Sequence, residues 1–128
     1  MARFLIHRHA AGRPHFDLRL VEEDTVRSWS MLKAPPEREG ERRLAIEREH
    51  LSVEQVGQAR IEEEAFGAGR ARVWDSGEVE VHTVAAGLLQ LRFAGSRLSG
   101  KYEMRRMRWY PGNRWLFVKS GGRYSKLT

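Results

Sequence analysis

The chain has 128 residues, 41% of them hydrophobic and 31% charged, which is typical of one compact globular domain and excludes a disordered or collagen-like chain. It contains no cysteine, so disulfides, thiolate zinc sites and cysteine nucleophiles are excluded. The formal net charge is +6 and 19 of the 23 basic residues are arginine, which favours a polyanionic partner, the alternative being a charge that only keeps the protein soluble.

The N-terminus carries only three consecutive apolar residues before charged ones follow. A signal peptide needs ~7–15 apolar residues and a membrane span ~18. We therefore expect a cytoplasmic protein without a membrane segment.

Runs of residues with an apolar side chain at every second position recur along most of the chain, separated by Gly, Pro, Asn or Ser. This pattern is typical of short strands joined by turns, and many strands with few helices indicate a barrel or a sandwich. The predicted strands are Phe4–His9, His15–Val21, Arg27–Met31, Leu44–Arg48, Arg70–Trp74, Glu78–His82, Leu88–Phe93, Leu98–Met104 and Trp115–Lys119.

Three segments are typical of hairpin turns: Asp75–Gly77, Ala94–Ser96 and Pro111–Asn113. A short helix is predicted only around Ser52–Gln58. The polar loop at residues 33–41 is too short to link two domains. We expect a single domain over residues 1–128, and a monomer.

Histidine and carboxylate side chains gather on the first two predicted strands. Because side chains alternate along a strand, His15, Asp17 and Arg19 share the face opposite to the apolar residues between them. The connection between the strands is only five residues long, so antiparallel pairing would bring His9 next to His15. Two imidazoles and one carboxylate suit Mn²⁺, Fe²⁺ or Zn²⁺. The alternative is a solvated strand face without a metal, and His7 is expected to be a surface or supporting group.

Motifs along nearly the whole chain support the first of these two interpretations. Ile6–His9 reads Ile-His-Arg-His, and Arg13–Leu20 reads Arg-Pro-His-Phe-Asp-Leu-Arg-Leu. Further motifs occur at Ser28–Ser30, Lys33–Pro35, Arg43–Ala45, Phe66–Gly69, Val73–Gly77, Leu98–Gly100, Met104–Met107 and Trp115–Lys119. Together they resemble the phosphoesterase domain found at the front of bacterial DNA ligase D and as free-standing bacterial and archaeal proteins.

The resemblance implies a small closed β-barrel of about eight strands, mainly β, with one short helix. It implies a metal-dependent enzyme that removes a 3′-terminal ribonucleoside from DNA, and then the 3′-phosphate, to leave a 3′-hydroxyl for repair. Manganese is the implied metal, with zinc or cobalt as alternatives, and the ligands are His9, His15 and Asp17. The implied substrates are DNA or RNA-tipped DNA 3′ ends in non-homologous end joining, with a DNA ligase or polymerase and Ku as partners.

Basic residues at matching positions are implied in phosphate contact. Arg19 offers a planar guanidinium that binds a phosphate through two parallel hydrogen bonds. Lys33 and Arg43 match two further basic positions of the family. From the residues alone, Lys33 also fits a plain loop lysine, and Arg43 fits one half of an ion pair with a nearby glutamate.

His50 matches a further active-site histidine of the family, acting as phosphate ligand or as proton donor to the leaving oxygen. The segment Glu47–Glu54 departs from the family pattern because it is one residue shorter between Arg43 and the histidine, lacks a proline and has Glu54 in place of a tyrosine. This departure supports a second hypothesis, a weakly active or inactive homologue that serves as a nucleic-acid-binding module.

The last third of the chain is the most basic, with ten Lys or Arg and one acidic residue after position 90. Arg105, Arg106 and Arg108, together with Arg13 near the histidines, are predicted to contact nucleic-acid phosphates. Trp109 is predicted either to stack on bases or to pack in the core. Trp115 opens an apolar strand and is predicted to lie in the core.

Overall fold

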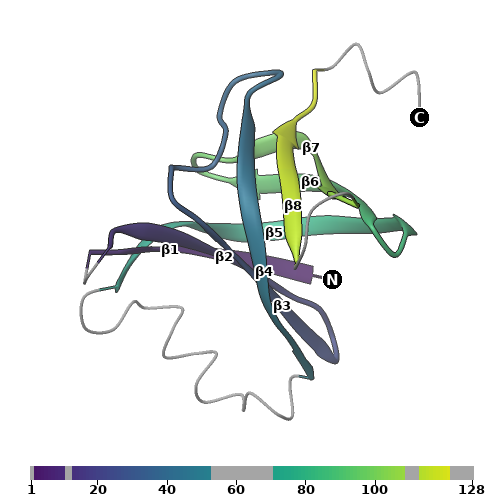
Figure 1. The fold of residues 1–128 in the computed structure, drawn as a ribbon, viewed down its shortest axis with the longest axis horizontal. Coiled ribbons are helices and arrows are strands. Elements are labelled where there is room, and N and C mark those ends of the chain that lie inside the picture. The colour runs from purple at the N-terminus through teal and green to yellow at the C-terminus, as the bar shows by residue number, and fades with distance from the viewer. Residues whose placement is uncertain (1, 11–12, 53–70, 109–112, 122–128) are drawn as a thin grey trace.

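A computed structural model describes residues 2–10, 13–52, 71–108 and 113–121 of the chain. All regular secondary structure in these residues is β-strand (Figure 1). The strands are β1 (Ala2–His9), β2 (His15–Val21), β3 (Thr25–Met31), β4 (Arg42–Ser52), β5 (Ala71–Ala85), β6 (Leu88–Gly95), β7 (Ser99–Arg106) and β8 (Arg114–Lys119).

Every strand pairs antiparallel with two neighbours, and the sheet closes into a barrel in the order β1-β2-β3-β4-β8-β7-β6-β5. The predicted closed barrel of about eight strands is therefore confirmed. The register of β1 on β5 shifts once, between Ile6 and His7. Figure 1 shows β4 and β8 crossing in front of the other strands.

Alternation along the strands fills the barrel interior with large apolar side chains. Phe93 packs edge-on against Phe4 and Tyr102, with ring centroids 4.8 and 5.0 Å apart. Trp29 and Trp115 also meet edge-on, at 5.7 Å, and both are fully buried. Trp115 thus lies in the core, as predicted. An eight-stranded barrel is just wide enough for side chains to fill, so the chemistry of this protein belongs to its outer face or its ends.

The hairpin turn predicted at Asp75–Gly77 is wrong, because β5 runs through this segment as one strand of 15 residues. The buried carboxylate of Asp75 accepts a hydrogen bond from the backbone N–H of Leu98 at 2.7 Å, and so stabilises the turn after β6. Gly77 lies so close to the backbone carbonyl of Ala94 that a Cβ atom would collide with it. These turn-type residues therefore serve a neighbouring turn and a close strand contact.

The other turn and helix predictions have mixed outcomes. A hairpin does connect β6 to β7, but later than the predicted Ala94–Ser96: Ala94 and Gly95 still belong to β6, and residues 96–98 form the connection. Of the helix predicted around Ser52–Gln58, Ser52 is instead the last residue of β4, and the remainder lies outside the described residues. Trp109 and the turn at Pro111–Asn113, except its last residue, also lie outside them.

Among the described residues, there is no helix that is long and apolar enough to span a membrane.

Candidate metal centre

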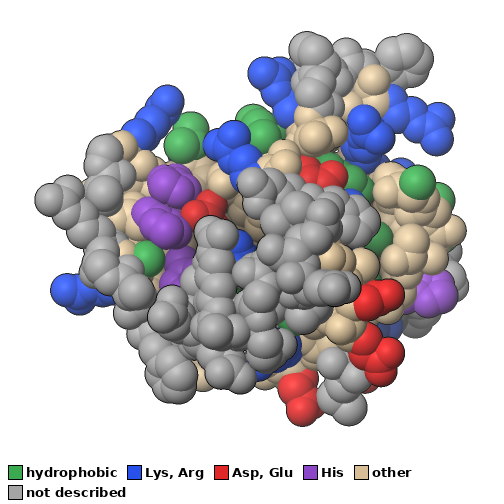
Figure 2. Space-filling view, turned by 90° about the horizontal axis from the view of Figure 1, so that it is seen from below, with side chains coloured by type: hydrophobic (Ala, Val, Ile, Leu, Met, Phe, Trp, Pro, Cys, Tyr) green, Lys and Arg blue, Asp and Glu red, His purple; other side chains and the backbone are tan. Residues whose placement is uncertain are grey.

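The candidate ligands come from the outer face of the barrel where β1 and β2 meet. β1 ends at His9 and β2 begins at His15, and the antiparallel register makes these residues direct partners, as the short connection predicted. Asp17 follows two positions along β2, so its side chain points to the same face as that of His15. Figure 2 shows histidine side chains gathered at one side of the molecule, with an acidic side chain beside them.

The two imidazoles converge on one carboxylate oxygen. Nε2 of His9 lies 2.8 Å from Oδ2 of Asp17, and Nε2 of His15 lies 3.3 Å from the same oxygen. The two rings stack almost parallel, with centroids 4.8 Å apart. His9, His15 and Asp17 each offer one ligand atom, and these three atoms all lie within 4.8 Å of one another. Each side chain is about one-third exposed, so the cluster is accessible to a substrate.

Hydrogen bonds from neighbouring groups orient these ligands. Nδ1 of His15 lies 3.1 Å from the carbonyl oxygen of Arg13, which orients the ring so that Nε2 points toward Asp17. Ser30 Oγ donates to Asp17 Oδ1 at 2.6 Å, and Arg48 Nε donates to Ser30 Oγ at 3.1 Å. Metal ligands in proteins commonly have such outer partners. The donor atoms and their orientation therefore fit a divalent metal ion.

His7 lies beside the cluster on the same face, opposite Asp17 in the β1–β2 ladder. Its side chain is buried, and its ring centroid lies 6.0 Å from that of His9. Burial lowers the pKa of His7 below its ordinary 6.5, the charges of His9 and Arg19 lower it further, and Asp17 acts in the opposite direction. His7 is therefore a buried, neutral neighbour of the cluster and not a surface group. Arg19 is half-buried on this face.

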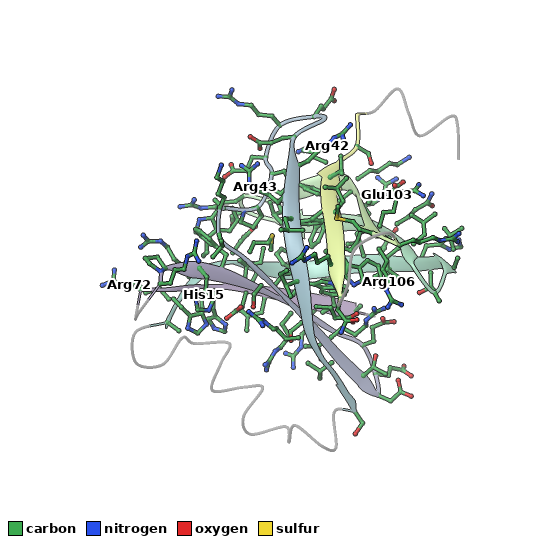
Figure 3. All side chains as sticks on the ribbon, in the orientation of Figure 1. His15, Arg42, Arg43, Arg72, Glu103 and Arg106 are labelled. Atoms are coloured by element: carbon green, nitrogen blue, oxygen red, sulfur yellow. The ribbon has the colours of Figure 1, made fainter. Side chains whose placement is uncertain are left out.

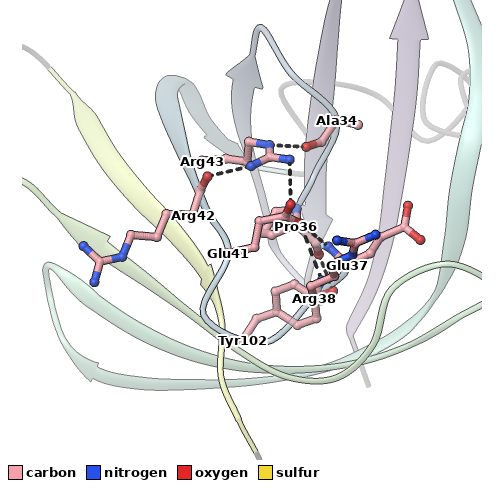
Figure 4. A network of polar contacts seen from close by, with 8 residues as sticks. All are labelled: Ala34, Pro36, Glu37, Arg38, Glu41, Arg42, Arg43 and Tyr102. Carbon is pink, nitrogen blue, oxygen red and sulfur yellow. Dashed lines mark hydrogen bonds and ion pairs between the residues drawn. The ribbon is translucent and has the colours of Figure 1, made fainter.

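The loop between β3 and β4 is tied to the barrel by the polar network in Figure 4. The hydroxyl of Tyr102, which is buried in the barrel, donates to the carbonyl oxygen of Pro36 at 2.6 Å. Burial raises the pKa of Tyr102, so this hydroxyl stays protonated. The carboxylate of Glu41 accepts a hydrogen bond from the backbone N–H of Glu37 at 2.9 Å. These contacts fix the loop that carries Lys33.

Arg43 is part of the same network. Its guanidinium donates to the carbonyl oxygen of Ala34 and forms an ion pair with Glu41 at 3.4 Å. The sequence offered an ion pair with a nearby glutamate as the alternative role of Arg43, and this ion pair is present. Arg43 and the exposed Lys33 also line a groove of about 620 Å³, which His15 lines as well. The structure thus brings both basic residues next to the cluster, and their contact with phosphate stays a prediction.

His50 is only partly described. Its backbone pairs with Arg27 in the β3–β4 ladder, and its side chain lies outside the described part of the chain, so its predicted role stays open. Glu47, at the start of the altered segment, accepts hydrogen bonds from Arg27 at 2.8 Å and from the indole N–H of Trp115 at 3.2 Å. Glu47 therefore stabilises the barrel next to its core tryptophans.

The basic residues predicted to bind nucleic acid fall into two places. Arg13 is exposed and lines the groove beside His15. Arg106 lies across the barrel from His15, with β4 and β8 passing between them in the view of Figure 3. Arg105, Arg106 and Arg108 line a second hollow of about 730 Å³. The structure therefore does not bring these three arginines to the cluster.

Sequence reasoning missed Ser30 and Arg48 as parts of the site. A weak signal exists, since Ser28 and Ser30 alternate with the buried Trp29 and so occupy the outer face of β3. Only the pairing of β2 with β3, however, places Ser30 opposite Asp17.

A model of the family described as "DNA Ligase D 3'-phosphoesterase domain" matches residues 7–106. The chain belongs to this family. The resemblance found in the sequence is thereby confirmed, and the coarse function is that of a phosphoesterase domain.

Curated relatives of this phosphoesterase domain are much longer proteins. The multifunctional non-homologous end joining DNA repair protein LigD of Mycobacterium tuberculosis is 33% identical over 121 residues, covering 88% of this chain and 15% of the relative. LigD of Pseudomonas aeruginosa is 28% identical over 127 residues, covering 94% and 15%. LigD of Mycolicibacterium smegmatis is 37% identical over 79 residues, covering 61% and 10%. The chain thus spans about 15% of the length of the first of these relatives.

Proposed function

We propose that this chain is a metal-dependent phosphoesterase that processes DNA 3′ ends. It removes 3′-terminal ribonucleosides as a phosphodiesterase and 3′-phosphates as a phosphomonoesterase, which leaves a 3′-hydroxyl for repair. The observation that carries the proposal is the convergence of His9, His15 and Asp17 within 4.8 Å, in a member of the phosphoesterase-domain family.

These three residues would hold one divalent ion, for which we propose manganese, with zinc or cobalt as alternatives. When bound, the metal supplies Lewis-acid polarisation of a phosphoryl oxygen. The protein supplies the orientation: Ser30 holds the carboxylate of Asp17, and the carbonyl oxygen of Arg13 fixes the ring of His15. Because these partners are in place before the substrate arrives, the ligands need little rearrangement.

Basic side chains around the cluster bind the substrate phosphate in this proposal. Arg19 donates two hydrogen bonds to the equatorial oxygens and stabilises the charge that develops there. Lys33 and Arg43 attract the phosphate from the groove wall. His50 donates a proton to the leaving oxygen or binds the phosphate directly.

The test is a 5′-labelled primer-template that ends in a 3′-phosphate or a terminal ribonucleotide, incubated with and without Mn²⁺. Wild-type protein is expected to shorten or dephosphorylate the primer only with the metal, and His15→Ala and Asp17→Ala are expected to lose both turnover and Mn²⁺ binding by calorimetry. His82→Ala, which removes an exposed histidine on β5, serves as the control. Unchanged Mn²⁺ affinity in both ligand variants would refute the site assignment.

The altered segment Glu47–Glu54 supports one competing function. If wild-type protein binds the primer-template and gives no product with any divalent metal, the chain is the nucleic-acid-binding homologue instead. Product from only one of the two substrates would confine the activity to a single step.

The names of the relatives place LigD in non-homologous end joining. We propose the same setting for this chain, as a cytoplasmic monomer that acts with a DNA ligase or polymerase and Ku. Size-exclusion chromatography with light scattering tests the oligomeric state, and pull-down with purified Ku tests the partner.

A further inference from the structure

A groove opens directly beside the candidate metal centre on the outer face of β3 and β4. It measures about 620 Å³ and is lined by His15 of the cluster and by Ser30, which donates to Asp17. Five basic residues line it: Arg13, Lys33, Arg42, Arg43 and Arg48. Among the described residues, no acidic side chain lines it, so this part of the groove is complementary to an anion.

Most of these basic groups are available to a ligand. In the described part of the chain, the side chains of Arg13, Lys33 and Arg42 form no hydrogen bond or ion pair. Within residues 2–10, 13–52, 71–108 and 113–121, Arg48 contacts Ser30 through Nε, and its two terminal amino groups form no further hydrogen bond there. Unneutralised cations in one groove repel each other, and a chain of phosphates offsets this repulsion.

The groove also has an apolar floor, which a site for free phosphate would not need. Leu32 and Leu44 are 57% and 49% exposed, and Ile46 lies beside them on the outer face of β4. Surfaces that bind single-stranded nucleic acid combine cations for the backbone with side chains, usually aromatic, that contact the faces of the bases. In this groove the aliphatic side chains of Leu32, Leu44 and Ile46 would make that contact. Cations and an apolar floor in one groove therefore favour a polynucleotide over a small anion.

The outer face continues from this groove toward the second basic hollow. Leu44 pairs with Leu116 on β8, and Leu116 pairs with Arg105 on β7. Directly paired residues of antiparallel strands share a face, so these three side chains form one row across the barrel. Leu44 lines the first hollow, and Leu116 and Arg105 line the second. The two hollows therefore adjoin at the Leu44–Leu116 pair.

The dimensions suit a short stretch of nucleic acid. From β2, which carries Asp17, to β7, which carries Arg105, the barrel order has four strand-to-strand steps. At ~4.8 Å per step this is about 19 Å, or about six steps of a nucleic-acid strand at 3.4 Å each. Glu103 on β7 forms an ion pair with Arg105 at 3.0 Å, and this exposed, salt-screened pair is too weak to withhold the arginine from a phosphate.

We propose that the strand carrying the 3′ end runs from the cluster across β3, β4, β8 and β7 to Arg105 near the end of β7. We call this surface the outer-face track and define it by Arg42, Leu44, Leu116 and Arg105. The inference rests on the proposed function, because it assumes that the cluster acts on a nucleic-acid end. It assigns Arg105, which lies far from the cluster, to the substrate segment several nucleotides upstream of that end.

The test measures binding by fluorescence anisotropy in EDTA, over a range of salt concentrations. The probes are a single-stranded oligonucleotide of about 12 nucleotides with a 3′-phosphate, which is longer than the track, and a dinucleotide with the same end. Arg42→Gln and Arg105→Gln are each expected to weaken oligonucleotide binding about tenfold and to lower the slope of log affinity against log salt by ~0.7. Arg105→Gln is expected to leave the affinity for the dinucleotide unchanged.

Leu44→Ser separates contact with the bases from contact with the phosphates. It is expected to weaken oligonucleotide binding without changing the salt slope, because it removes no charge. Arg92→Gln is the matched control, since this exposed arginine of β6 lies off the track and pairs with Glu80. It is expected to bind the oligonucleotide like the wild type.

Wild-type affinity and salt slope in both Arg42→Gln and Arg105→Gln would overturn the track. Equal competition by heparin, together with unchanged binding by Leu44→Ser, would also overturn it, since the surface would then bind any polyanion. Turnover of the same oligonucleotide with Mn²⁺ reports separately on the proposed function. If the wild type turns over the oligonucleotide but Arg42→Gln and Arg105→Gln bind it like the wild type, the track alone is refuted. If both variants bind more weakly but the wild type gives no turnover, the catalytic proposal alone is refuted.

Discussion

Ser30→Ala tests whether the carboxylate of the candidate metal centre is held ready by its neighbour. The substitution removes the hydroxyl that donates to Asp17 at 2.6 Å and accepts from Arg48 at 3.1 Å. A hydrogen bond to a charged group contributes about 1.5–3 kcal/mol, and 1.4 kcal/mol is a factor of ten in affinity. Because Asp17 is 29% exposed and water replaces part of the lost bond, the lower end applies. We expect Mn²⁺ affinity to fall about tenfold.

Isothermal titration of Mn²⁺ into the purified protein measures this effect. Ser28→Ala is the matched control, since Ser28 lies on the same face of β3 two positions away and pairs with Arg19 in the ladder. Ser30→Thr keeps a hydroxyl on a residue type that suits a strand, and is expected to retain most of the affinity. If Ser30→Ala binds Mn²⁺ as tightly as Ser28→Ala, the hydrogen bond to Asp17 does not orient a metal ligand and the reasoning fails.

Three further predictions concern the phosphate site and the loop beside it. Arg19→Lys keeps the charge and loses the planar fork, so turnover should fall on the order of 10²-fold for a loss of ~2.7 kcal/mol, and wild-type rates would make Arg19 a structural residue. Tyr102→Phe removes the hydrogen bond to Pro36, and urea denaturation should show a free energy of unfolding lower by about 1–2 kcal/mol; an unchanged value would contradict the loop tether. The pKa of Glu41 is lowered, chiefly by the backbone N–H of Glu37, so its stabilisation is present above the ordinary pKa of 4.5 and is lost as the pH falls through the lowered value. The stability difference between wild type and Glu41→Gln should therefore shrink in acid, and a difference that does not vary with pH would show that this carboxylate is not held.

The sequence alone determined the class of the fold and the heart of the candidate site. Period-two patterns are local, because side-chain alternation depends only on neighbouring residues, so the strands were recognisable before any pairing was known. The closeness of His9 and His15 was also local. A connection of five residues leaves two consecutive strands little choice except to pair, and the observed register joins the two histidines directly.

Local sequence patterns gave a wrong prediction where a residue interacts with a partner far along the chain. Asp75 and Gly77 are turn-forming residue types, and they were predicted to form a turn. Asp75 instead accepts a hydrogen bond from Leu98, and Gly77 allows the close approach of Ala94. Short-range propensity is weak against contacts of this kind, since a buried carboxylate needs its hydrogen bonds wherever along the chain the donors lie.

Only the tertiary structure decided how the outer face is assembled. Ser30 reaches Asp17 because β3 pairs with β2 in one register, and a shift of one residue would turn its hydroxyl away from the carboxylate. The pairing of β4 with β8 joins Leu44 to Leu116 across more than half the chain, which no local pattern predicts. The same closure separates Arg105 from the cluster by four strand steps while keeping both on one continuous face. Register between distant strands is set by the summed packing of the whole barrel, so the sequence supplies these residues and the closed barrel decides which of them meet.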